Sequence, residues 1–271
     1  MHVDQQPYRD LYDALHEDAC EPRVTLASWV ERHGAEVLWL SGLRERCGPA
    51  TRAALEDLWR LYALARVLDV LTLPFQQGVA DGSDWPGPSI TLEEWRDFAG
   101  RLGLAVVVPE RFTPFDCEIV SAVQAPKPAA AIALLRTHWP CLMLGDMLVL
   151  RAGTSVSGGS TFLNAEVAAS STLYWAYRRK TRPHVDLSDG WGSNSQWRTR
   201  FRRDYRVGDR TFLNVDGEHD LASGTLVPLD EEDRLTREQR IELLTHRCFV
   251  LTTKDSTDLW PWDDTLVTTR A

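Results

Sequence analysis

The chain has 271 residues, a hydrophobic content of 44% and a formal net charge of -9. This length and composition allow a large buried core and disfavour intrinsic disorder. The longest apolar runs, residues 129–135 and 141–150, are too short to cross a bilayer, and the first 18 residues lack the basic and apolar regions of a secretory signal. We therefore expect a cytoplasmic protein without a membrane partner.

The cysteine pattern and the acidity exclude further classes of protein. Five cysteines are scattered along the chain without CxxC spacing, which indicates reduced thiols rather than a disulfide framework or a zinc ribbon. The acidic balance, with a pI of about 5.3, disfavours duplex nucleic acid as a partner, because duplex affinity depends on many cations that offset phosphates. A local basic patch could still hold one nucleotide or one carboxylate.

The first hundred residues have the apolar spacing of packed helices. Pro22 favours a helix start, and Thr91 with Glu94 three positions later forms a capping-box pattern that begins another helix. Residues 74–89 are rich in glycine and proline and predict a surface loop. We expect residues 1–104 to form a helical N-terminal region that packs on the rest. The periodicity predicts its first helices over residues 8–19, 24–33, 35–47 and 49–71.

From residue 105 onward, short β-prone runs alternate with glycine, proline and aspartate. Thr236 with Gln239 forms a second capping-box pattern and predicts one late helix. We expect residues 105–271 to form a mostly antiparallel β region, so that the fold class is α+β. The alternative is that the helical and β regions form one continuous domain. The predicted strands lie near Val106, near Ile119, and over residues 147–151, 166–168, 172–177 and 248–253.

The segment 178–206 differs in charge from the rest of the chain. It holds nine arginines and lysines against three aspartates, a local charge of +6 in a chain whose net charge is -9. Such asymmetry indicates a surface that binds anions or the acidic regions of the same protein.

Within this segment the sequence predicts a β-hairpin. Gly208 and Asp209 have the character of a two-residue turn, and the register places Tyr205 opposite Phe212. A strand before this turn would carry a row of polar side chains at two-residue spacing, which would repel one another unless solvated, paired with acids or facing an anion. That row consists of Gln196, Arg198, Arg200, Arg202 and Asp204.

A glycine-flanked loop precedes the row. Trp191 lies between two glycines, and Ser193 and Asn194 follow it. A loop of this kind can turn its backbone amides toward an anion while the indole stacks on a planar ligand. The alternatives are a solvated arginine face, pairing with the carboxylates of the chain, or a protein interface. The predicted ligand-binding residues are Trp191, Ser193, Asn194, Gln196, Arg198, Arg200 and Arg202.

Acid/base chemistry near these cations would use His184, Asp186, Glu118 and Asp204 as titratable groups. For Glu118, which lies in an apolar strand-like run, a structural ion pair with an arginine is the alternative. His184 and Asp186 also form an HxD pattern, for which a distal histidine could complete an iron site. Because such spacing arises by chance in an acidic chain, we expect no metal. The weak metal candidates are His184, Asp186, His219 and His246.

Three functions stay open. The first is a pocket lined by arginine and tryptophan that binds a small phosphate- or carboxylate-bearing ligand, with or without catalysis. The second is a non-catalytic inhibitor of the immunity or antitoxin type, whose acidic surface covers a basic protein partner. The third is a non-haem iron oxygenase. The chain has no HExxH, GxSxG or Walker A motif, and its sequence indicates no particular cofactor.

Overall fold

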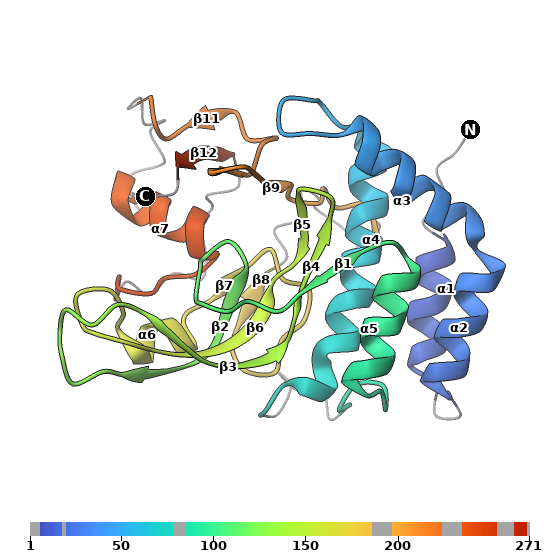
Figure 1. Cartoon of the computed structure of the whole chain (residues 1–271), viewed down its shortest axis with the longest axis horizontal. Coiled ribbons are helices and arrows are strands. Elements are labelled where there is room, and N and C mark those ends of the chain that lie inside the picture. Colours follow the sequence, from blue (N-terminus) through green and yellow to red (C-terminus); the bar gives the residue numbers. More distant parts are fainter. Residues whose placement is uncertain are drawn as a thin grey trace.

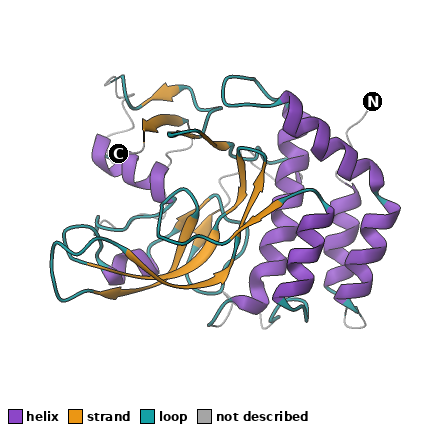
Figure 2. Ribbon diagram, in the orientation of Figure 1, coloured by secondary structure: helices purple, strands orange, loops and turns teal. Residues whose placement is uncertain are grey.

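A computed structural model describes residues 6–17, 20–78, 85–185, 197–223, 235–253 and 263–269. Helices occupy the N-terminal part of these residues, strands occupy most of the remainder, and one longer helix comes late (Figures 1 and 2). The predicted α+β fold class is confirmed. The helices are α1 (Gln6–Leu15), α2 (Pro22–Arg32), α3 (Gly34–Arg46), α4 (Leu55–Thr72), the 3-10 turn η1 (Leu73–Phe75), α5 (Leu92–Arg101), α6 (Ala165–Ser170) and α7 (Arg237–His246).

The strands of the described residues form one large sheet and two small ones. The large sheet has the order β1-β4-β5-β9-β10-β12-β11, and all its pairs are antiparallel except β11 with β12. A second sheet has the order β2-β6-β3, and β7 pairs with β8. The strands are β1 (Ala105–Val107), β2 (Cys117–Gln124), β3 (Ala133–Trp139), β4 (Cys141–Leu144), β5 (Met147–Leu150), β6 (Ala152–Gly158), β7 (Leu173–Tyr174), β8 (His184–Val185), β9 (Asp204–Val207), β10 (Arg210–Leu213), β11 (His219–Asp220) and β12 (Asp264–Thr269).

Helix α4 is the centre of the helical part. Most faces of this helix carry buried leucines and valines, of which Leu61, Leu64 and Leu68 are fully buried. These side chains belong to one hydrophobic cluster that also contains Trp139 and Val149 of the sheets. In Figure 1, α4 stands between the other N-terminal helices and strands β4 and β5. The core is therefore continuous across residue 104, and the predicted division of the chain at that position stays a prediction.

Local signals in the sequence located several elements correctly. Both capping boxes are formed, with Thr91 accepting from the backbone of Glu94 and Thr236 accepting from that of Gln239. The hairpin of β9 and β10 is also confirmed, with Tyr205 paired to Phe212 around a turn in which Gly208 has a φ of +60°. A positive φ at this position suits glycine, as the predicted turn requires.

The predicted strand over residues 166–168 is wrong, because this segment is helix α6. The side chain of Asn164 accepts hydrogen bonds from the backbone N–H groups of Glu166 and Val167 and so caps the helix. The predicted strand over residues 248–253 is also wrong. The Glu242 carboxylate instead accepts hydrogen bonds from the backbone N–H groups of Val250, Leu251 and Thr252. The chain therefore turns around this side chain.

The predicted arginine strand is wrong for its described part. Strand β9 begins only at Asp204, and residues 198–203 have no strand structure. The side chains do not alternate either: Arg200 is exposed, whereas Arg202 and Arg203, which are adjacent, are both buried. These two arginines are held by side-chain hydrogen bonds to α7 and to residues 48–51, and not by the backbone hydrogen bonds of a strand pair.

Candidate functional site

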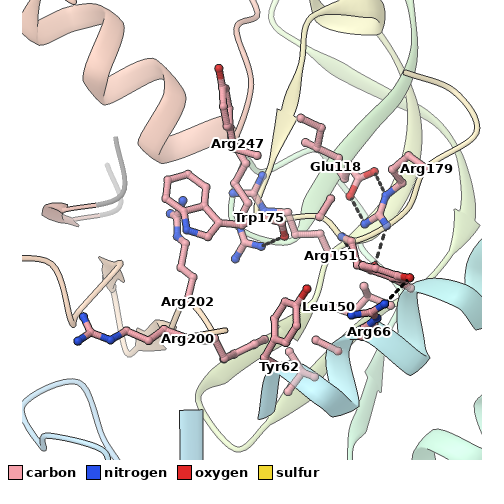
Figure 3. Close-up of a pocket in the computed structure, with 18 residues that line it drawn as sticks. Tyr62, Arg66, Glu118, Leu150, Arg151, Trp175, Arg179, Arg200, Arg202 and Arg247 are labelled. Carbon is pink, nitrogen blue, oxygen red and sulfur yellow. Dashed lines mark hydrogen bonds and ion pairs between the residues drawn. The ribbon is translucent and has the colours of Figure 1, made fainter. Parts of the chain in front are cut away.

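A small cavity lies where α4, β5, the segment 173–179 and the segment 200–202 meet, with Arg247 at the end of α7 completing it (Figure 3). Its volume is about 40 Å³, which is room for about three water molecules or one small anionic group. Among the described residues, six arginines and two acids line it, so its charge is strongly positive. The charged lining residues are Arg66, Arg151, Arg179, Arg200, Arg202, Arg247, Asp69 and Glu118.

Two of these arginines share one carboxylate, that of Asp204, and a third lies near it. Arg202 donates from Nε to Asp204 Oδ1 at 2.8 Å, and Arg247 donates from Nη2 to Oδ2 at 2.9 Å. The backbone N–H of Asn214 also donates to Oδ1, at 2.7 Å. Asp204 is completely buried, and Arg151 has no carboxylate of its own but lies close enough to lower the pKa of Asp204. One negative charge therefore faces three guanidiniums.

The end of α7 supplies the remaining acceptors. Arg151 donates to the carbonyl oxygens of Thr245 and His246 at 2.7 and 2.6 Å, and Arg202 donates to that of Leu244 at 2.5 Å. The last carbonyls of a helix lack partners within the helix and carry partial negative charge, so cations stabilise this end. Part of the arginine cluster is thus explained by the docking of α7.

The helix end does not satisfy every donor. Arg151 Nε, Arg202 Nη1 and Arg247 Nε are buried and have no hydrogen-bond partner among the described residues. Arg151 and Arg202 are each more than nine-tenths buried. A buried donor without an acceptor costs about 1–3 kcal/mol, and more when it is charged. The lining of the cavity thus contains unsatisfied donors on side chains that cannot reach bulk solvent.

The electrostatics show the same imbalance. Burial lowers the pKa of Arg151 to about 9, and repulsion from Arg247 and Arg202 adds to this effect. Burial also lowers the pKa of Arg202 to about 10, with Asp204 opposing and Arg247 reinforcing the shift. For Asp204, burial would raise the pKa, but the guanidiniums of Arg202 and Arg247 outweigh it and bring the pKa to about 2. Guanidinium groups remain charged in proteins, so the lowered pKa values mean that these charges are held at a desolvation cost, to which repulsion between the arginines adds.

On the opposite wall of the cavity, one arginine is paired with two carboxylates. Arg179 donates to both carboxylate oxygens of Glu118 at 2.6 and 2.8 Å and to Asp69 at 2.7 Å. All three side chains are buried. Burial raises the pKa of Asp69, whereas for Glu118 the arginines outweigh burial and lower the pKa. Glu118 therefore lies in the lining as the ionised partner of Arg179, which is the ion-pair arrangement weighed for it from the sequence.

Aromatic rings also line the cavity and contact its arginines. The Arg202 guanidinium lies 4.2 Å from the ring centroid of Trp175, and that of Arg66 lies 3.9 Å from the centroid of Tyr177. Cation–π contacts of this kind hold arginines in place without neutralising them. Figure 3 shows the arginines converging beside Trp175, whereas the Arg200 guanidinium points away from them.

The sequence-predicted ligand residues are only partly brought together. Arg200 and Arg202 line the cavity. Arg198 is exposed and lies over Trp59, at 5.6 Å from the ring centroid. Four predicted ligand residues lie outside the described residues, so the predicted glycine-flanked loop stays untested. These are Trp191, Ser193, Asn194 and Gln196.

The titratable candidates are separated. Glu118 pairs with Arg179, and Asp204 pairs with Arg202 and Arg247. His184 lies on β8, and Asp186 falls outside the described residues. Among the residues that the structure describes, no three histidines, cysteines or acids gather in a way that could hold a metal ion. His219 neighbours Asp264, and His246 stacks on Phe112.

Sequence reasoning missed several residues that line the cavity. Arg151 follows an apolar strand, Arg247 follows the late helix, and Tyr62 and Arg66 lie one helical turn apart on α4. A signal existed only for Arg66 and Arg151, which are charges inside apolar runs. Such residues are rarely buried without a partner, so each could have been marked as part of an internal polar cluster.

Within the described ranges, no helix combines the length and the apolar character that a membrane span requires. Comparison of the chain with models of protein families, with curated proteins and with solved structures finds no match.

Proposed function

We propose that the protein binds a small ligand through a phosphate or carboxylate group held in the arginine cavity. The observation that carries the proposal is the surplus of buried positive charge: Arg202 and Arg247 share the single carboxylate of Asp204, Arg151 has no ion pair among the described residues, and all three retain donors without acceptors. Guanidinium groups bind phosphate and carboxylate oxygens through paired, charge-assisted hydrogen bonds. An anion in the cavity would satisfy those donors and balance the charge.

A purely structural role for the cluster is the competing explanation. In that case the arginines serve to dock the end of α7, and water satisfies the remaining donors. The two explanations differ in one respect, because a structural lattice does not discriminate between phosphate and chloride. Selective stabilisation by an oxyanion therefore supports binding.

The test measures binding of inorganic phosphate and of acetate by calorimetry and by thermal unfolding, at constant ionic strength set with sodium chloride. Phosphate or acetate should raise the Tm of the wild type by mass action. Arg247→Gln should weaken binding by roughly tenfold or more, because it removes one charged hydrogen-bond donor. Arg240→Gln is the matched control, since Arg240 is a buried arginine on α7 paired with Asp264 and does not line the cavity.

Equal responses to phosphate, acetate and chloride would refute the proposal. It would also be refuted if both variants bound as the wild type does. Catalysis is not part of the proposal, and the acidic inhibitor and the iron oxygenase stay predictions from the sequence.

A further inference from the structure

The unsatisfied donors of the arginine cavity belong to three side chains from different parts of the fold. They are Arg151 Nε at the junction of β5 and β6, Arg202 Nη1 before β9, and Arg247 Nε after α7. Each of these nitrogen atoms is buried, and none has a hydrogen-bond partner among the described residues. A ligand that satisfies all of them has to offer an acceptor oxygen to each of three guanidiniums.

The number of acceptor oxygens separates the classes of anion. A carboxylate has two oxygens in one plane, so one of them would have to serve two guanidiniums. A tetrahedral oxyanion, such as sulfate or phosphate, can direct a separate oxygen to each guanidinium. The cavity, with a volume of about 40 Å³, has room for one such group. The arrangement of donors therefore favours a tetrahedral anion over a planar one.

The charge around the cavity favours two negative charges on that anion. Among the described residues, six arginines and the carboxylates of Asp69 and Glu118 line the cavity, and Asp204 adds a third carboxylate through its ion pairs. The Arg200 guanidinium points away from the others (Figure 3). The other five guanidiniums face three carboxylates, which leaves a formal charge of +2. A dianion would balance this charge, whereas a monoanion would leave part of it buried without a partner.

The acidic side chains of the lining are already occupied as acceptors. Arg179 donates to both carboxylate oxygens of Glu118 and to one of Asp69. The backbone N–H of Tyr177 donates to the other oxygen of Asp69 at 2.8 Å. A proton on the bound anion would therefore point toward donors and would take the place of one accepted hydrogen bond, which weakens binding in a buried site.

We infer that the anionic group held in the cavity is a tetrahedral dianion, a sulfate or a doubly charged phosphate, and not a carboxylate or a singly charged phosphate. This inference rests on the proposed function, which requires only that an oxyanion binds to these arginines. It adds that the shape and the protonation of the oxyanion decide its affinity.

The experiment compares sulfate, inorganic phosphate and acetate by calorimetry on the full chain, at constant ionic strength set with sodium chloride. Phosphate is mostly singly charged at about pH 5.5 and mostly doubly charged at about pH 8, because its second proton is lost near neutral pH. At the lower pH, sulfate should bind roughly tenfold or more tightly than phosphate, as expected for one lost charged hydrogen bond. At the higher pH, the affinity for phosphate should rise roughly tenfold toward that of sulfate. Acetate should bind more weakly than sulfate at both.

Sulfate is the internal control for titration of the protein, because its charge is the same at both pH values. The pKa of Asp204 is about 2 and that of Arg151 is about 9, so both groups keep their charge over this range. Burial lowers the pKa of His246, at the end of α7, to about 4 and raises the pKa of Tyr177 to about 12. A change for phosphate that sulfate does not share therefore reports the proton on the ligand.

Two variants assign the binding to this cavity. Arg247→Gln removes one of the three donors and should weaken the binding of both sulfate and phosphate. Arg240→Gln should weaken neither, since Arg240 is a buried arginine on α7 that pairs with Asp264 and does not line the cavity.

The possible failures are distinguishable. The inference is overturned, and the proposed function stands, if sulfate and phosphate bind equally at the lower pH or if acetate binds as tightly as sulfate. A preference for sulfate that stays the same at the higher pH would also overturn it, because the proton on the ligand would then have no effect. If none of the three anions binds to the wild type, or if Arg247→Gln binds them as the wild type does, both the inference and the proposed function are overturned.

Discussion

Asp204→Asn tests the charge balance of the cavity directly, because it removes the one carboxylate shared by Arg202 and Arg247 while keeping the shape of the side chain. Both guanidiniums would stay buried without a counter-charge. Breaking a buried pair in this way costs roughly 3–5 kcal/mol. The pKa of Asp204, lowered from 3.8 to about 2, independently corresponds to about 2–3 kcal/mol of stability at neutral pH.

The assay is urea unfolding at pH 7 followed by tryptophan fluorescence, with and without phosphate at constant ionic strength. The variant should lose at least about 2 kcal/mol of unfolding free energy. Since the lowered pKa stabilises only the ionised carboxylate, the difference between wild type and variant should be complete above about pH 5 and disappear as the pH falls toward 2. Phosphate should restore part of the loss, because an anion in the cavity replaces the missing charge.

Asp264→Asn is the matched control. Asp264 is also a buried aspartate, but among the described residues its ion pair is with one arginine, Arg240, at 3.3 Å, and burial raises its pKa despite that arginine. Its loss should be smaller, and phosphate should not restore it. A loss below about 1 kcal/mol for Asp204→Asn, or equal recovery of both variants in phosphate, would refute the reasoning.

Other predictions concern stability. Burial, with repulsion from Arg151, lowers the pKa of His246 to about 4. The unfolded chain therefore binds this proton first, and about 3 kcal/mol of stability should be lost as the pH falls from 6.5 to 4. His246→Gln should flatten that part of the pH profile, and an unchanged profile would refute it. Thr91→Ala and Thr236→Ala should each cost about 1 kcal/mol in urea unfolding through the loss of a helix cap, and both being neutral would contradict the capping boxes. Arg179→Met should cost roughly 3–5 kcal/mol because it strands two buried carboxylates; a two-state unfolding curve of wild-type stability would exclude that ion pair.

The parts of the fold that were predictable from sequence depend on local interactions. The capping boxes and the hairpin around Gly208 involve residues three to seven positions apart, so their chemistry is visible in short windows. Helix α6 and the segment after Cys248 were misjudged because Asn164 and Glu242 control them through side-chain hydrogen bonds to the backbone. Such contacts override the apolar pattern on which a strand prediction relies.

Little of the cavity could be predicted from the sequence. The excess of arginine in residues 178–206 directed attention to Arg200 and Arg202, which line the cavity, but it also suggested that alternating arginines would form one face. Arg151 and Arg247 reach the same cavity from distant parts of the chain. Their convergence depends on hydrogen bonds from Arg151 and Arg202 to the last carbonyls of α7 and on the ion pair of Arg247 with Asp204. No short-range sequence pattern records these contacts.

The backbone of Arg247 adds a last consequence. This residue follows α7 with a φ of 61°, the left-handed conformation that glycine usually supplies at the end of a helix. A side chain in that conformation costs about 1 kcal/mol or more. Glycine would make the chain more stable locally but would remove a guanidinium from Asp204 and from the cavity. At this helix end, a strained backbone conformation is therefore retained together with the placement of a charge beside Asp204.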